Sequence, residues 1–141
     1  MGQLDYDLVD YVGQLREGIL EAYTGIVTGL KKTPQGYFAH CSSSSPQSFF
    51  SNKLFPVSLL LPHAPSIFEL LHRCLNDEER TDALMRLCYG LIGDLADCFP
   101  SGQLKQLLLA NWVAAELRAR NRMPEETKKT MRWAREVGAP A

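Results

Sequence analysis

The sequence has 141 residues, of which 45% are hydrophobic and 22% are charged, and its net charge is −1. This length and composition are typical of one soluble globular domain with a core of its own. A nearly neutral chain has no overall attraction for nucleic acid or membrane. No stretch approaches the roughly 18 to 20 apolar residues of a membrane span, and the acidic N-terminus lacks the pattern of a signal peptide.

The cysteines indicate the compartment. Cys41, Cys74, Cys88 and Cys98 have no paired spacing of the zinc or redox kind. Three of them fall where the chain reads as helical and apolar, and a reduced cysteine there acts as a small hydrophobe. We therefore expect an intracellular, reducing compartment.

Charge is distributed in blocks along the chain. The net charge is −4 over residues 1–30, +3 over 31–58, −4 over 59–99 and +4 over 100–141. An acidic body with a basic tail indicates two faces with different partners or one internal charge complementarity, and the alternative is an ordinary solvated helix surface.

The first predicted helix spans Leu8 to Leu30, where apolar residues recur every three or four positions. Its expected buried stripe comprises Leu8, Val12, Leu15, Ile19, Tyr23, Ile26 and Leu30. Acids precede this segment and two lysines follow it, which suits the helix macrodipole at both ends.

Four more helices are predicted after residue 59. One runs from about Ser66 to Leu75, and the next carries its apolar stripe from Leu84 to Phe99. A fourth helix carries its stripe from Leu104 to Ala115, with Trp112 on the buried side and Ser101 as its cap. The fifth begins at Pro124 and ends near Gly138, because proline suits a first helical position and glycine a helix end.

These helices predict an all-α fold, an armadillo-like α-solenoid of antiparallel HEAT-repeat helix hairpins. Residues 59–99 form one expected hairpin and residues 100–138 the terminal one, each close to the ~40 to 47 residues of a HEAT or armadillo unit. Residues 4–32 are then the second helix of a truncated repeat. Residues 33–58 form an insert that we expect to be disordered, although its four phenylalanines are unusual for a solvated linker.

Three segments closely resemble, in the same order, helices near the C-terminus of the importin beta family of nuclear transport receptors. They are residues 15–27 (LREGILEAYTGIV), 90–95 (GLIGDL) and 130–136 (TMRWARE). The resemblance covers residues 4–32 and 59–137, and residues 79–100 resemble the fungal branch. It implies that the chain holds the last few HEAT repeats of such a receptor. The insert has no counterpart in the family, and its lack of acids suggests translated non-coding sequence, such as a retained intron.

The second helix of each repeat lines the concave face of a solenoid. Non-core positions on these helices supply the candidate partner-binding residues Glu17, Glu21, Asp82, Asp94 and Trp133. Carboxylates pair with Lys or Arg, and an indole face accepts a cation, so this set suits a basic helical ligand. The alternative is a solvated acidic face and a core tryptophan.

The resemblance implies the partner and the location. The family binds the basic importin-beta-binding segment of importin alpha on its inner surface, within a cycle that moves between cytoplasm and nucleus through the nuclear pore. It also implies that contacts with Ran and nucleoporins belong to the full-length receptor, in repeats that this chain lacks. No cofactor is expected.

Other functions have weaker support. The three histidines have no metal-ligand spacing, and a set of Cys88 or Cys98 with His72 and Asp94 has no positional signal, so no catalytic or metal site is expected. A generic HEAT scaffold with another partner remains an alternative. Nucleic-acid binding is another, through the basic cluster Arg118, Arg120, Arg122, Lys128, Lys129, Arg132 and Arg135.

Overall fold

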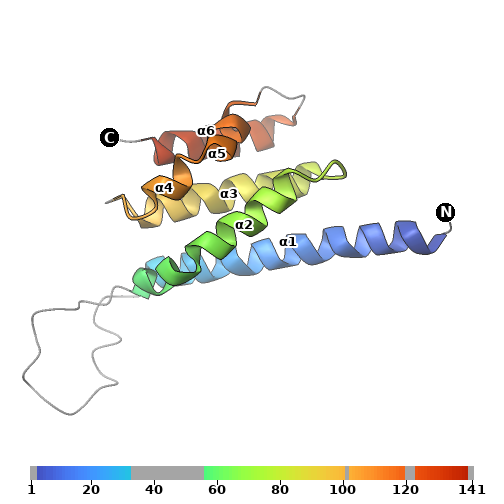
Figure 1. The fold of residues 1–141 in the computed structure, drawn as a ribbon, viewed down its shortest axis with the longest axis horizontal. Coiled ribbons are helices and arrows are strands. Elements are labelled where there is room, and N and C mark those ends of the chain that lie inside the picture. Colours follow the sequence, from blue (N-terminus) through green and yellow to red (C-terminus); the bar gives the residue numbers. More distant parts are fainter. Residues whose placement is uncertain (1–2, 33–55, 101, 120–122, 140–141) are drawn as a thin grey trace, which may run out of the picture.

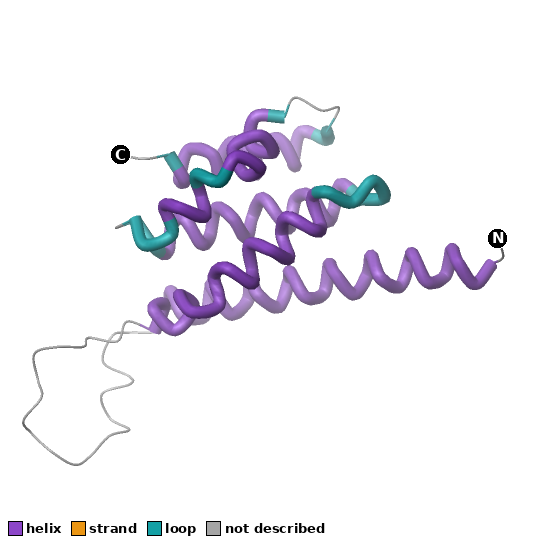
Figure 2. The backbone as a smooth tube through the Cα atoms, in the orientation of Figure 1, coloured by secondary structure: helices purple, strands orange, loops and turns teal. Residues whose placement is uncertain are grey.

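The computed structural model describes residues 3–32, 56–100, 102–119 and 123–139 (Figure 1). Every regular element in these ranges is helical (Figure 2), which confirms the all-α prediction. In chain order the elements are α1 (Gln3–Lys32), the 3-10 helix η2 (Pro56–His63), α2 (Ala64–Leu75), α3 (Asp82–Cys98), α4 (Lys105–Leu108), α5 (Asn111–Arg118) and α6 (Glu125–Gly138). Residues 33–55 of the predicted insert lie outside the described residues, whereas 56–58 begin η2.

The helices form two layers. In Figures 1 and 2, α1, α3 and α6 lie side by side and run in the same direction, while α2, α4 and α5 lie in front of them. Helix α3 is central, because it packs against α1 on one side and α6 on the other. Helix α2 runs antiparallel to α3 and packs on it, and α5 packs on α6. This is a solenoid of stacked helix hairpins whose second helices share one layer.

Helix α3 owes its position to its start and its apolar faces. Thr81 is the N-cap, and its hydroxyl accepts a hydrogen bond from the Leu84 amide at 3.1 Å. Pro100 follows the C-cap, Phe99, where a helix cannot continue. Between these ends more than half of the residues of α3 are buried, so this helix forms much of the core that joins the two layers. Its buried residues are Leu84, Met85, Cys88, Tyr89, Leu91, Ile92, Gly93, Leu95 and Ala96.

The helix predicted at residues 8–30 exists, but the prediction of its buried stripe is only partly right: Tyr23 and Leu30 pack against the core cluster, whereas other members do not. The fully buried residues of α1 are Leu20 and Val27, and the helix packs against α3 and η2. Leu8, Leu15 and Ile26, expected to be buried, are about half exposed or more. The periodicity identified an apolar face of α1 correctly. The residues that are fully buried, however, lie on a neighbouring apolar face, which is the one turned toward α3.

The prediction of a single helix around Leu104 to Ala115 is wrong, because the structure has two helices there, α4 and α5. Ala110 adopts an extended conformation with φ −55° and ψ 138°, and this residue separates α4 from α5. The change of direction buries Val113 and Leu117 of α5. No proline or glycine marks the break, so the sequence pattern did not reveal it. Ser101, the expected cap, lies outside the described residues.

Trp112 packs between the outer helices, in the role predicted for it. Its ring stacks on His72 with centroids 4.6 Å apart and meets Phe68 edge-on at 6.3 Å. Both partners belong to α2, so this contact joins the first hairpin to α5. The tryptophan is half-buried and packs against the core cluster.

Candidate partner-binding face

Helix α1 also has a polar side, distinct from its buried residues and from its exposed apolar residues. Asp10, Gln14, Glu17 and Glu21 recur at steps of three and four, which puts them on one face of the helix. Asp10 accepts a hydrogen bond from Gln14 at 2.7 Å. Glu21 is exposed, and Glu17 is half-buried. This stripe is the α1 part of the candidate face.

Polar contacts at both ends align α1 with α3. Arg16 forms an ion pair with Asp77, just before α3 begins, and Lys31 pairs with Asp97 near its end. Between these pairs, Glu17 accepts a hydrogen bond from the Thr81 hydroxyl at 2.9 Å. These contacts fix how far α1 is shifted along α3, and therefore which carboxylates face the same space. They also mean that Glu17 is already hydrogen-bonded within the chain.

Helix α3 carries the central part of the face. Asp82, Arg86, Gly90, Asp94 and Asp97 recur at steps of four, four, four and three, so they form one stripe. Asp82 lies exposed in the first turn, and Arg86 is an exposed cation within the acidic stripe. The twelve residues from Asp82 to Asp94 correspond to about 18 Å along the helix.

Asp94 differs from the other acids of the face. It is half-buried, and among the described residues it forms no salt bridge. Burial raises the pKa of its carboxyl above the ordinary value, while the charge of Lys31 opposes this rise and Asp97 adds to it. A partly desolvated carboxylate without a salt bridge gains more from an arriving cation than a fully hydrated one does.

Trp133 lies against the backbone of α3 at Gly93, the residue that precedes Asp94 in the chain. A Cβ atom placed on Gly93 would lie within 2.8 Å of three indole carbons of Trp133. The ring therefore occupies the space that a side chain at residue 93 would fill, and glycine is required for this approach. Trp133 as a residue is 38% exposed, so part of it remains available to a ligand.

The structure divides the predicted residues into two ends of one face. Glu17 contacts Thr81, so it lies near Asp82 at the N-terminal end of α3, whereas Asp94 and Trp133 lie near the C-terminal end. Glu21 is one turn further along α1 than Glu17. This arrangement can hold cationic side chains at two places about 18 Å apart, which a helical ligand of about 12 residues spans.

The prediction from sequence missed two features of this face. One is the seat of Trp133 on Gly93, for which the only signal was a glycine inside a helical pattern. The other is that Lys31 pairs with Asp97 and neutralises its charge. The signal for this was a lysine at the C-terminal end of α1. Both are contacts between helices distant in the chain.

The residues weighed for other functions lie elsewhere. The ring of His72 stacks on Trp112, and Cys88 is fully buried, where its hydrogen bond with Cys74 and its burial both raise the pKa of its thiol. In the basic cluster, Lys128 and Arg132 each lie 3.8 Å from Glu125, so part of its charge is balanced within α6. Arg120 and Arg122 lie outside the described residues.

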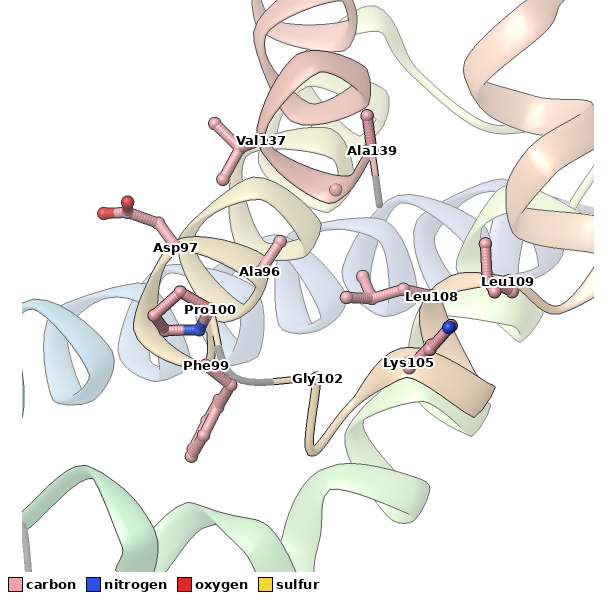
Figure 3. A pocket seen from close by; sticks show the side chains of 11 residues that line it. Ala96, Asp97, Phe99, Pro100, Gly102, Lys105, Leu108, Leu109, Val137 and Ala139 are labelled. Carbon is pink, nitrogen blue, oxygen red and sulfur yellow. The ribbon is translucent and has the colours of Figure 1, made fainter. Parts of the chain in front are cut away.

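A cavity of about 520 Å³ lies between the ends of α3 and α6 and the start of α4. Its charged lining residues are Asp97 and Lys105, and Figure 3 shows the Asp97 carboxylate pointing away from the Lys105 ammonium. The rest of the lining is mostly apolar. No convergent polar set of the kind that orients a small molecule is present in this lining.

In the described part of the chain, no helix is long and apolar enough to cross a membrane. Within those same residues, no three His, Cys, Asp or Glu side chains come together as a metal site would require.

Comparison with known proteins identifies the family. The family profile described as "Importin subunit beta-1-like, TPR repeats" matches residues 1–42 and 51–121. The chain belongs to the importin beta family. It is 35% identical over 134 residues to importin subunit beta-1 of Schizosaccharomyces pombe and 31% identical over 135 residues to that of Saccharomyces cerevisiae. These alignments cover 94% and 92% of the chain but only 13% of each relative.

Solved structures of the family agree with this assignment. A crystal structure of importin beta obtained in an ammonium sulfate condition superposes with a TM-score of 0.74 at 35% identity, over 96% of this chain and 14% of that one. A second, obtained in a polyethylene glycol condition, gives the same TM-score at 39% identity. The fold is thus the importin beta solenoid of HEAT repeats, of which this chain spans about one seventh.

Proposed function

We propose that this chain contributes to nuclear import by binding the basic importin-beta-binding segment of importin alpha on the face formed by α1, α3 and α6. The observation that carries the proposal concerns Asp94 and Trp133: Asp94 is a half-buried carboxylate on α3, and the partly exposed Trp133 of α6 packs on the residue before it, Gly93. A lysine or arginine entering there gains both an opposite charge and an aromatic face. Membership of the importin beta family supports this partner. The location that follows is cytoplasm and nucleus, with passage through the nuclear pore.

The rest of the face supports a helical ligand rather than a single cation. Glu21 and Asp82 are exposed acids near one end, and Asp94 lies about 18 Å from Asp82 along α3. A basic helix laid along α3 can place charged residues at both ends. Glu17 contributes less, because it already accepts a hydrogen bond from Thr81.

The expected affinity is modest. Each exposed charge pair contributes only about 0.2 to 1 kcal/mol, and the face offers few such pairs. The dissociation constant should therefore be micromolar or weaker, a binding free energy of about −8 kcal/mol or less favourable. Binding should weaken as salt increases, because exposed charges are screened beyond about 8 Å at physiological ionic strength.

The test is a titration of the fluorescently labelled basic segment of importin alpha at low and high salt. Asp94→Asn should raise the dissociation constant, and Asp94→Lys should raise it further. Glu69→Gln is the matched control, since it removes one exposed acid from the outer helix α2. If Asp94→Asn and Glu69→Gln weaken binding equally, or if binding is independent of salt, the ligand does not lie on this face.

A further inference from the structure

The C-terminal end of the candidate face already holds a cation that belongs to the chain itself. Lys31, near the end of α1, donates a hydrogen bond from its ammonium to the Asp97 carboxylate and forms an ion pair with it. Asp94 lies one turn earlier on the same stripe of α3, and residues three apart on a helix are neighbours. The lysine is therefore close to the carboxylate to which the cation of a ligand would bind.

The charge of Lys31 acts on Asp94 as well as on Asp97. Burial raises the pKa of the Asp94 carboxyl, and the charge of Lys31 opposes that rise. In return, Asp94 adds to the increase in the pKa of Lys31, whose main cause is the hydrogen bond with Asp97. Lys31 is therefore protonated at neutral pH. Two carboxylates and one ammonium leave this end of the face with a net charge of −1 instead of −2.

We propose that Lys31 limits the affinity of this face for basic ligands, because its ammonium repels the cation that binds at Asp94. The inference rests on the proposed function and adds to it a residue that weakens the same interaction. A lysine that only held α1 against α3 would have the opposite effect, since its removal would loosen the face and weaken binding. The sign of the change in affinity therefore separates the two roles.

Lys31 can be replaced without disturbing the stack of helices. Its side chain is 34% exposed and that of Asp97 is 49% exposed, so solvent reaches the ion pair. Exposed ion pairs of this kind contribute little to stability. The ion pair of Arg16 with Asp77, which joins α1 to the segment before α3, stays in place.

The test is a double-mutant cycle at Lys31 and Asp97 in the full 141-residue chain, titrated with the labelled basic segment at low salt. Lys31→Gln should lower the dissociation constant about two- to fivefold, the size of one exposed charge interaction. Asp97→Asn should raise it by a similar factor, because Lys31 is then no longer balanced. The double variant should bind nearly as the wild type does, since the local charge is again −1. Lys31→Arg keeps the charge and should also bind like the wild type.

Arg73→Gln is the control for overall charge. It removes one cation and breaks an exposed ion pair with Glu69, but it lies on the outer helix α2. This variant should leave the dissociation constant unchanged. The gain from Lys31→Gln should shrink as salt increases, because salt screens the repulsion that the substitution removes. Circular dichroism should show equal helix content in all variants.

Two kinds of result would overturn the inference. If Lys31→Gln binds no better than the wild type, or if Arg73→Gln gains as much, Lys31 does not limit the affinity. The proposed function would survive that result as long as Asp94→Asn still weakens binding. If the wild type does not bind the segment, or if Asp94→Asn has no effect, the proposed function fails and this inference fails with it.

Discussion

Gly93→Ala should displace the indole of Trp133 and lower the stability of the chain, whereas Gly90→Ala should raise it. The added methyl group would lie within 2.8 Å of three ring carbons, where carbon atoms normally approach only to about 3.5 to 4.0 Å. Overpacking of this kind costs about 1 to 3 kcal/mol. Alanine recovers about 1 kcal/mol of helix propensity, so the net loss is about 0 to 2 kcal/mol.

Gly90→Ala is the matched control, three residues earlier on the same helix. A Cβ atom there meets Thr130 Cγ2 at 3.8 Å, an ordinary contact. This variant should therefore gain about 0.5 to 1 kcal/mol. Urea unfolding followed by circular dichroism measures both changes, and the indole N–H resonances report the rings separately. Only that of Trp133 should move in Gly93→Ala, with weaker binding of the basic segment. Equal stabilisation by both substitutions would refute the seat proposed for the ring.

Three further outcomes follow from contacts elsewhere. Trp112→Ala should cost about 3 kcal/mol by thermal or urea unfolding, because it removes the ring stacked on His72, and Trp112→Phe should retain much of that stability. Thr81→Ala should cost about 1 kcal/mol through loss of the α3 cap, whereas Thr81→Ser should cost little. The hydrogen bond from Arg16 holds the pKa of Asp77 below its ordinary value. This pair should stabilise the fold above about pH 4 and lose that contribution as the pH falls further; an Arg16→Ala variant should show a weaker loss over the same range.

The candidate face depends on contacts that a ligand has to share or displace. Glu17 already accepts the Thr81 hydroxyl, and Asp97 is paired with Lys31. Asp94 forms no such bridge among the described residues, and its burial has already removed part of its hydration. A cation arriving at Asp94 therefore meets a carboxylate that needs no rearrangement, which is why we expect this residue to dominate the charge response.

The helical class and most helix limits could be predicted from local sequence signals alone. Residues 64–75, 82–98 and 125–138 carry apolar residues at helical spacing with suitable caps or terminators, and the helices form there. These signals are local, since each depends on residues within one or two turns of one another. The similarity of segments such as residues 15–27 to importin beta was also readable from the chain alone.

Tertiary structure alone decided which surfaces these helices bury. Helix α1 has two apolar faces, and periodicity cannot say which one faces α3; packing buries Leu20 and Val27 and leaves Leu8 and Leu15 exposed. The break at Ala110 likewise depends on burying α5 rather than on a breaker residue. The seat of Trp133 joins residues 40 positions apart in the chain. Such contacts depend on the relative placement of whole helices, which no local pattern encodes.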